Sequence, residues 1–156
     1  MWVPDLPNAN MPNNREVADL LLGSGWDFDC SLVIGHSSGA MQLLYLLQNL
    51  DEGVAVSTAV MVSAFDRPVP GMEVQHIGLF SEPYNYDAIQ NHAKSRIFIH
   101  GVDDPWCPLQ GARNLARHTN SEMVEINGGG HFSTSLDARW KEFPELVDAL
   151  NQRNIL

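Results

Sequence analysis

Five consecutive residues, Gly35-His36-Ser37-Ser38-Gly39, have the types and the spacing of a nucleophilic serine motif. In a G-x-S-x-G motif, a sharp turn between a strand and a helix exposes the central hydroxyl so that it can attack a carbonyl carbon. The setting fits, because the apolar run at 31–34 precedes the motif and the apolar stretch at 39–50 follows it. A plain turn of small residues is the alternative. The motif predicts Ser37 as the nucleophile and the backbone N–H of Ser38 as a donor to the oxyanion.

A serine nucleophile needs a histidine base, and the base needs a carboxylate that orients it. Of the six histidines, His131 is the best placed, because it follows the last predicted strand directly after three glycines that give the loop freedom. The others, among them His36 and His100, lie inside the serine motif or on segments without a loop, and are interpreted as solvated or core side chains. The carboxylate is expected just past another strand, where the sequence offers both Asp103 and Asp104.

The chain order is therefore Ser37, then Asp103 or Asp104, then His131, which is the nucleophile–acid–histidine order of α/β-hydrolases. No comparable pattern indicates a metal or another cofactor. The sequence contains no H-E-x-x-H, no C-x-x-C and no pair of histidines at ligand spacing, so we expect catalysis without a metal or cofactor.

Short apolar strands alternate with amphipathic helices along the chain, and these elements must position the three side chains. Strands are predicted at 31–34, 57–62, 96–100 and 122–126, and helices at 39–50, at 109–118 and along 136–150, where Pro144 splits the helical pattern. The alternation predicts βαβ crossovers and a mainly parallel sheet. We expect a three-layer α/β/α sandwich in a single domain over residues 1–156, with Gly35 and Gly39 avoiding collisions between the motif's strand and helix.

The composition argues against some classes of binding partner and indicates a cellular compartment. Nine Lys and Arg against 19 Asp and Glu give a net charge of −10, which disfavours binding to nucleic acid or to an anionic membrane. The two cysteines are too few for a disulfide framework, and no apolar run approaches the ~20 residues of a membrane span. The first residues lack the features of a signal peptide. We expect a cytoplasmic protein with no nucleic-acid or membrane partner, and the sequence identifies no protein partner.

These residues together resemble the small serine hydrolases of the α/β-hydrolase superfamily, the retinoblastoma-binding protein 9-like family. The resemblance rests on the serine motif at 35–40, on Asp103-Asp104-Pro105-Trp106-Cys107-Pro108 and on Gly130-His131-Phe132, and it covers most of the chain. In that family the second aspartate of the Asp-Asp-Pro segment orients the histidine, which implies Asp104 here. The resemblance also implies an esterase-like acyl hydrolase that acts on small esters or amides without a cofactor.

One departure from the family concerns the N-terminus. The chain begins at a segment, residues 2–8, that resembles the family's second strand and the loop after it. The preceding strand, Gly-rich loop and helix, about 25–35 residues, are expected to be missing. The strand predicted at 2–4 would then be separated from the strand at 31–34 by a gap, unless the sheet re-pairs. The missing loop would supply the second oxyanion donor, and the loss of one donor lowers kcat by about 10²–10³.

Two functions of different classes follow from this sequence. The first is a serine hydrolase that forms an acyl-enzyme on Ser37, and the second is a catalytically impaired or non-catalytic interaction protein that keeps the fold. A flavodoxin-like binding domain would also fit the alternation of strands and helices. It leaves the order of Ser37, Asp104 and His131 without an explanation.

Overall fold

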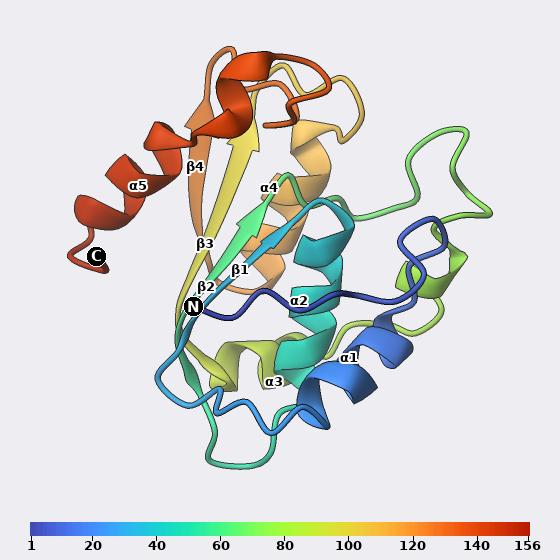
Figure 1. Ribbon diagram of the computed structural model, residues 1–156, viewed down its shortest axis with the longest axis vertical. Coiled ribbons are helices and arrows are strands. Elements are labelled where there is room, and N and C mark those ends of the chain that lie inside the picture. The colour runs from blue at the N-terminus through green and yellow to red at the C-terminus, as the bar shows by residue number, and fades with distance from the viewer.

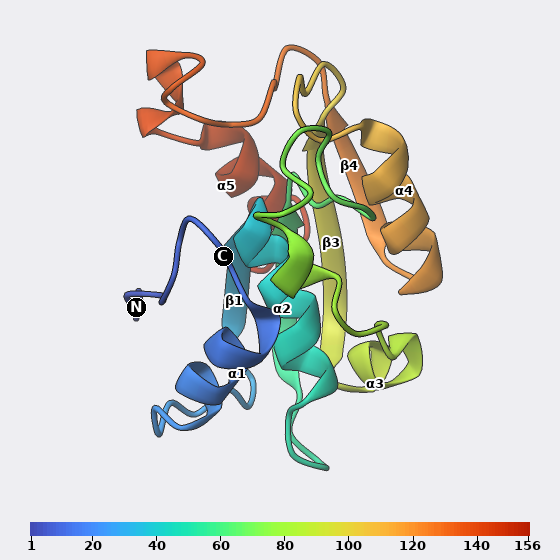
Figure 2. The same cartoon turned by 90° about the vertical axis from the view of Figure 1, so that its right-hand side faces the viewer.

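The computed structural model describes all 156 residues and has a parallel sheet at its centre (Figures 1 and 2). The strand order is β1-β2-β3-β4, and every neighbouring pair is parallel. The strands are β1 (Leu32–His36), β2 (Val56–Val62), β3 (Ala93–Gly101) and β4 (Glu122–Ile126). All four lie where the apolar runs predicted them, although β3 begins three residues earlier.

Helices cover both faces of this sheet, as Figure 1 shows. One face carries α2 (Ser38–Gln48), α3 (Tyr86–Asn91) and α4 (Leu109–His118), and α1 (Asn14–Leu22) packs against α2. The other face carries α5 (Pro144–Asn151), which begins at the proline that was expected to split the last helical pattern. Two short 3₁₀ turns are η1 (Ile77–Leu79) and η2 (Ala138–Lys141). The expected three-layer α/β/α arrangement is confirmed, and none of the helices has the length and apolar character that a membrane span requires.

The central strands are apolar on both faces because helices cover both. Side chains alternate along a strand, so Ala59 and Met61 of β2 point to α2 whereas Val60 and Val62 point to α5. All four are buried. The two resulting hydrophobic cores fix the carboxyl ends of the strands, where the loops that carry the predicted functional residues begin.

The N-terminal segment differs from the prediction. Residues 2–4 do not form a strand, and β1 remains an edge strand with only β2 beside it. A strand needs a partner with free backbone groups, and Pro4 has no N–H of its own to donate. The segment is held instead by side chains, since the Trp2 ring stacks on Trp26 with centroids 5.2 Å apart. The sheet therefore ends at β1, and neither expected outcome, a gap between two strands or a re-paired sheet, occurs.

The junction between β1 and α2 leaves no room for a side chain at Gly35. A Cβ on Gly35 would overlap the backbone of Gly39 and would lie 2.9 Å from the Cα of Ala40, and neither backbone can move without shifting the helix. At Gly39 a Cβ would meet nothing within 4 Å. The expectation of a collision is therefore confirmed for the first glycine of the motif and wrong for the second.

We expect Gly35→Ala to lower the free energy of unfolding by about 2–4 kcal/mol, because the added methyl group forces strand and helix apart. The matched control is Gly39→Ala, which should leave stability unchanged or raise it by up to about 1 kcal/mol, because alanine favours the helix. Urea unfolding followed by circular dichroism measures both. Equal losses in the two variants would contradict the packing argument.

Two histidines lie in the core rather than at the surface. His100, on β3, donates from Nε2 to the carbonyl of Cys107 at 2.9 Å, and His76 accepts the Val69 N–H at Nδ1. Burial lowers the pKa of both histidines, although neighbouring carboxylates favour their charged forms. A histidine whose pKa is lowered by folding contributes stability above its ordinary pKa of about 6.5, and that stability is lost as the pH falls below it.

We therefore expect the free energy of unfolding to fall as the pH is lowered from 7 to 5. In His100→Gln the decline should be shallower than in the wild type, by up to about 1.4 kcal/mol per pH unit, because one proton fewer is taken up on unfolding. Denaturant unfolding at several pH values gives the slope, which is independent of any overall loss of stability in the variant. An identical slope in both proteins would show that His100 does not contribute.

Candidate active site

Ser37 lies at the sharp turn between β1 and α2. Its backbone has φ 56° and ψ −122°, a conformation that non-glycine residues rarely adopt, and its N–H donates to the Val62 carbonyl at 2.9 Å. The side chain makes no capping bond to the helix that it precedes. Its hydroxyl is therefore held at the end of the sheet and free for another partner, which is the geometry that the motif predicted.

That partner is His131, in the loop after β4. The Nε2 atom of the buried His131 ring lies 3.0 Å from Ser37 Oγ, although the two residues are 94 positions apart in the sequence. The loop can bring the ring there because it approaches the end of β3 closely: a Cβ on Gly101 would overlap the Gly130 carbonyl. The glycines thus provide close packing in addition to the expected freedom of the loop, with Gly130 at φ 53°.

Asp104, in the turn after β3, is the carboxylate that meets His131. Its Oδ2 lies 2.7 Å from His131 Nδ1, and its fully buried side chain also accepts the backbone N–H groups of Trp106 and Cys107 at Oδ1, both at 2.9 Å. Asp103 is exposed and instead accepts the Gly130 N–H at 3.1 Å. The structure therefore brings together Ser37, Asp104 and His131 and leaves Asp103 outside this chain of hydrogen bonds.

The electrostatics of Asp104 favour a charged carboxylate. Burial acts to raise the pKa of Asp104, but the hydrogen bonds from His131, Cys107 and Trp106 outweigh it, so the pKa lies below its ordinary value. An ionised Asp104 can only accept, so the proton in this hydrogen bond resides on Nδ1 of His131. The lone pair of Nε2 then faces Ser37 Oγ, and this is the arrangement that allows a histidine to remove a serine proton.

Two histidines that the sequence reasoning set aside lie against these residues. His36, inside the serine motif, donates from Nε2 to the backbone carbonyl of His131 at 2.8 Å, and the two rings are 4.9 Å apart. His100 places Nε2 3.7 Å from Asp104 Oδ2. Both residues stand at the carboxyl ends of strands beside the predicted functional loops, and this position was the only signal in the sequence. His36 holds the loop of His131 through this hydrogen bond, and His100 holds the loop of Asp104 through its bond to the Cys107 carbonyl.

The half-exposed ring of Trp106 covers His131 from the outside. It meets the imidazole edge-on with centroids 4.8 Å apart. Ser38 is the first residue of α2, so its N–H is one of the donors that a helix leaves without an acceptor of its own. The N–H of Ser38 is thus available at the positive end of the helix dipole, next to Ser37.

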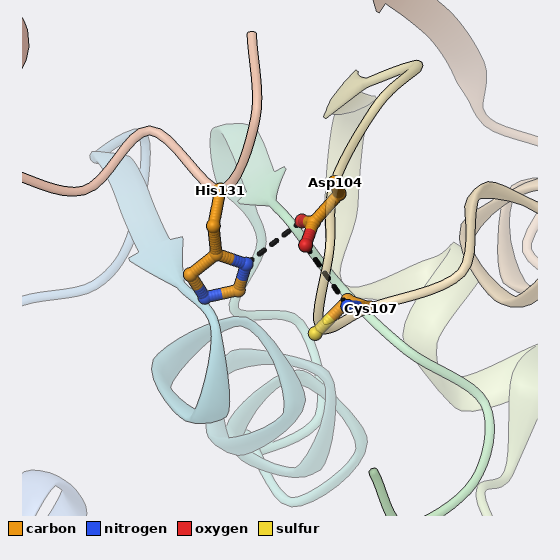
Figure 3. Close-up of side chains that lie close together, drawn as sticks. All are labelled: Asp104, Cys107 and His131. Carbon is orange, nitrogen blue, oxygen red and sulfur yellow. Dashed lines mark hydrogen bonds and ion pairs between the residues drawn. The ribbon is translucent and has the colours of Figure 1, made fainter. Parts of the chain in front are cut away.

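Asp104, Cys107 and His131 together have the donor types of a metal site (Figure 3). One ligand atom from each lies within 4.8 Å of the other two. Asp104 Oδ2 and His131 Nδ1 already bond to each other, however, and a metal ion would have to break that hydrogen bond. Burial also raises the pKa of the Cys107 thiol, which disfavours the thiolate that a metal binds. The residues therefore fit their mutual hydrogen bonds better than they fit a metal ion.

Comparison with known proteins finds similarity between this chain and hydrolases. Rat serine hydrolase RBBP9 is 26% identical over 117 residues, which cover 75% of this chain and 58% of the rat protein. The putative hydrolase YdeN of Bacillus subtilis is 24% identical over 148 residues, or 94% of this chain and 76% of the relative. The chain thus spans somewhat more than half the length of the rat relative.

The crystal structure of the ydeN gene product from B. subtilis superposes with a TM-score of 0.85 at 23% identity, over 96% of this chain and 79% of the other. That likeness establishes the α/β-hydrolase fold. The family model described as serine hydrolase matches residues 28–152, a range that contains Ser37, Asp104 and His131. The chain belongs to the serine hydrolase family.

Proposed function

We propose that this protein hydrolyses small carboxylic esters or amides through an acyl-enzyme on Ser37. One observation carries the proposal: a continuous line of hydrogen bonds from Ser37 Oγ to His131 Nε2 at 3.0 Å and from His131 Nδ1 to Asp104 Oδ2 at 2.7 Å. A serine, a histidine and a buried carboxylate in this order form the arrangement that activates a serine hydroxyl. Membership in the serine hydrolase family supports the same chemistry.

In the first half of the reaction, Ser37 Oγ attacks the acyl carbon while His131 Nε2 takes the hydroxyl proton. The carbonyl oxygen becomes an oxyanion that the Ser38 N–H stabilises. His131 then donates its proton to the leaving alcohol or amine, and the acyl group remains bound to Ser37. Asp104 stays ionised throughout and stabilises the positive charge that develops on the imidazole.

In the second half, water replaces the leaving group. His131 Nε2 removes a proton from the water, the resulting hydroxide attacks the acyl carbon, and a second oxyanion forms beside the Ser38 N–H. Collapse of this intermediate breaks the bond to Ser37 Oγ and releases the carboxylic acid. The proton on His131 returns to Ser37, so the enzyme is regenerated without any cofactor.

The alternative is a catalytically impaired protein that keeps the fold. The Ser38 N–H alone would stabilise the oxyanion less than two donors do, by about 3–4 kcal/mol. The two functions differ in whether Ser37 reacts, and labelling with a serine-directed probe decides between them.

We also propose that the protein works in the cytoplasm, since both cysteines, the exposed Cys30 and the buried Cys107, are unpaired.

We expect a fluorophosphonate probe to label the wild-type protein on Ser37, and Ser37→Ala to abolish labelling. The matched control is Ser38→Ala, because only the backbone N–H of Ser38, the first residue of α2, is assigned a role, so labelling should persist. In-gel fluorescence measures the rate, and circular dichroism checks the fold of each variant. A folded wild-type protein that stays unlabelled would favour the catalytically impaired alternative.

We expect Asp104→Asn to slow labelling by about 10³–10⁴-fold. An asparagine amide that donates toward Nδ1 of His131 moves the proton to Nε2, and Nε2 then cannot accept the proton of Ser37. Asp103→Asn is the control: an asparagine oxygen still accepts the Gly130 N–H, so the labelling rate should stay within about threefold of the wild type. Equal effects of the two substitutions would show that the neighbouring aspartates are not distinguished.

A further inference from the structure

The indole of Trp106 is a large apolar surface beside the reactive residues. Its backbone N–H donates to Oδ1 of Asp104 at 2.9 Å, so the turn after β3 fixes where the side chain begins. The ring contacts that of His131, with centroids 4.8 Å apart, and is still 41% exposed. β3 is an inner strand with β2 on one side and β4 on the other, so this exposure does not arise at a sheet edge. The indole therefore contacts the proposed base and has surface left for a further partner.

The proposed reaction defines which part of a substrate lies on the side of His131. Four groups surround the acyl carbon in the tetrahedral intermediate: Ser37 Oγ, the oxyanion, the leaving group and the acyl substituent. The oxyanion points to the N–H of Ser38, and the leaving atom has to lie within hydrogen-bond distance of His131 Nε2, which protonates it. The leaving group is therefore the part of the substrate that extends along the imidazole, which Trp106 covers from the outside.

The indole is close enough to contact a leaving group in this position. Nε2 of His131 lies 3.0 Å from Ser37 Oγ, and a leaving oxygen takes a similar distance from the same nitrogen. An imidazole is small, so an aromatic ring on that oxygen comes within the centroid distances of about 4.5–7 Å at which aromatic pairs attract. The other ring against His131, that of His36, is already held by its bond to the His131 carbonyl. Trp106 is thus the aromatic side chain that is available to the substrate.

Charge argues against an ionic leaving group. His131 becomes positively charged when it takes the proton of Ser37, so a cationic leaving group beside it is repelled. The carboxylates of the same turn do not offset this repulsion, because Asp104 bonds to His131 and Asp103 accepts the Gly130 N–H. An anionic leaving group would meet the ionised Asp104 and a net charge of −10. An uncharged aromatic group fits both the indole and the charges around it.

We propose that Trp106 determines the specificity for the leaving group, by packing its indole against an uncharged aromatic alcohol or phenol. This inference rests on the proposed hydrolysis and names the substrate class as esters with an aromatic leaving group. A side chain that only covered His131 would need apolar bulk, whereas a partner for an aromatic group needs an aromatic ring. That difference separates a specificity role from a structural one.

Two esters with the same acetyl group test the proposal. Phenyl acetate and hexafluoroisopropyl acetate have leaving groups of similar acidity, and only the first is aromatic. Both give the same acetyl-enzyme, so the comparison uses kcat/KM, which is not affected by the shared second half of the reaction. Trp106→Leu keeps apolar bulk over His131, and Trp106→Phe keeps an aromatic ring. The ratio of the two kcat/KM values on one sample does not depend on how much of a variant is folded.

In Trp106→Leu the preference for phenyl acetate, expressed as this ratio, should fall by about three- to tenfold, from the loss of one aromatic pair. In Trp106→Phe it should stay within about twofold of the wild type. An unchanged ratio in an active Trp106→Leu would overturn the inference and leave the hydrolase function intact. A folded wild-type protein that hydrolyses neither ester would overturn both. A larger loss for acetylcholine than for phenyl acetate in Trp106→Leu would show that the indole binds a cation, against the proposal.

A binding measurement that needs no turnover gives a second test. In Ser37→Ala, which cannot be acylated, saturating phenyl acetate should shift the NMR signal of the Trp106 indole N–H, because an aromatic ring lies against it. Trp106→Phe assigns this signal by its loss. Cyclohexyl acetate is the matched ligand, since its ring has a similar size and no aromatic electrons, and it should give a shift at least about threefold smaller. An unmoved signal, or equal shifts with the two ligands, would contradict the contact.

Discussion

The hydrogen bond between His131 and Asp104 is the interaction on which the site depends, because it joins the loops after β4 and β3. A parallel sheet places the carboxyl ends of neighbouring strands at the same end of the sheet, so these loops begin side by side. The close approach of Gly101 to Gly130 then leaves no space between the two loops. The carboxylate is held from its other side by two backbone N–H groups, so its orientation does not depend on the histidine alone.

Ser37 is brought to this pair by a strained turn rather than by a flexible loop. Its positive φ costs of order 1–3 kcal/mol, which the surrounding packing has to offset. The offset comes from β1 and α2, which contact each other so closely that Gly35 cannot carry a side chain. The residue is therefore placed by two rigid elements. A hydroxyl held in this way keeps its distance to Nε2 of His131 without further hydrogen bonds, and its proton remains free for transfer.

The same rigid strand is one of the two edge strands of the sheet. β1 holds the serine at its carboxyl end and has an unpaired edge along its length, with an apolar cavity beside it that extends to Ser38 and Gly39. β1 thus both ends the sheet and leads directly into the turn that holds Ser37.

Much of this arrangement could be predicted from the sequence, because it depends on local patterns. The four strands are apolar runs that end at glycine or polar residues, and the serine turn follows from small residues between a strand and a helix. α1 was not predicted, although Asn13 caps its first turn. The strand expected at 2–4 does not form, because pairing depends on a partner that is distant in sequence. The spacing of residues also left Asp103 and Asp104 as alternatives, and only the family resemblance favoured the second. The tertiary structure distinguishes them, because two adjacent side chains in a turn point in different directions and only Asp104 reaches His131.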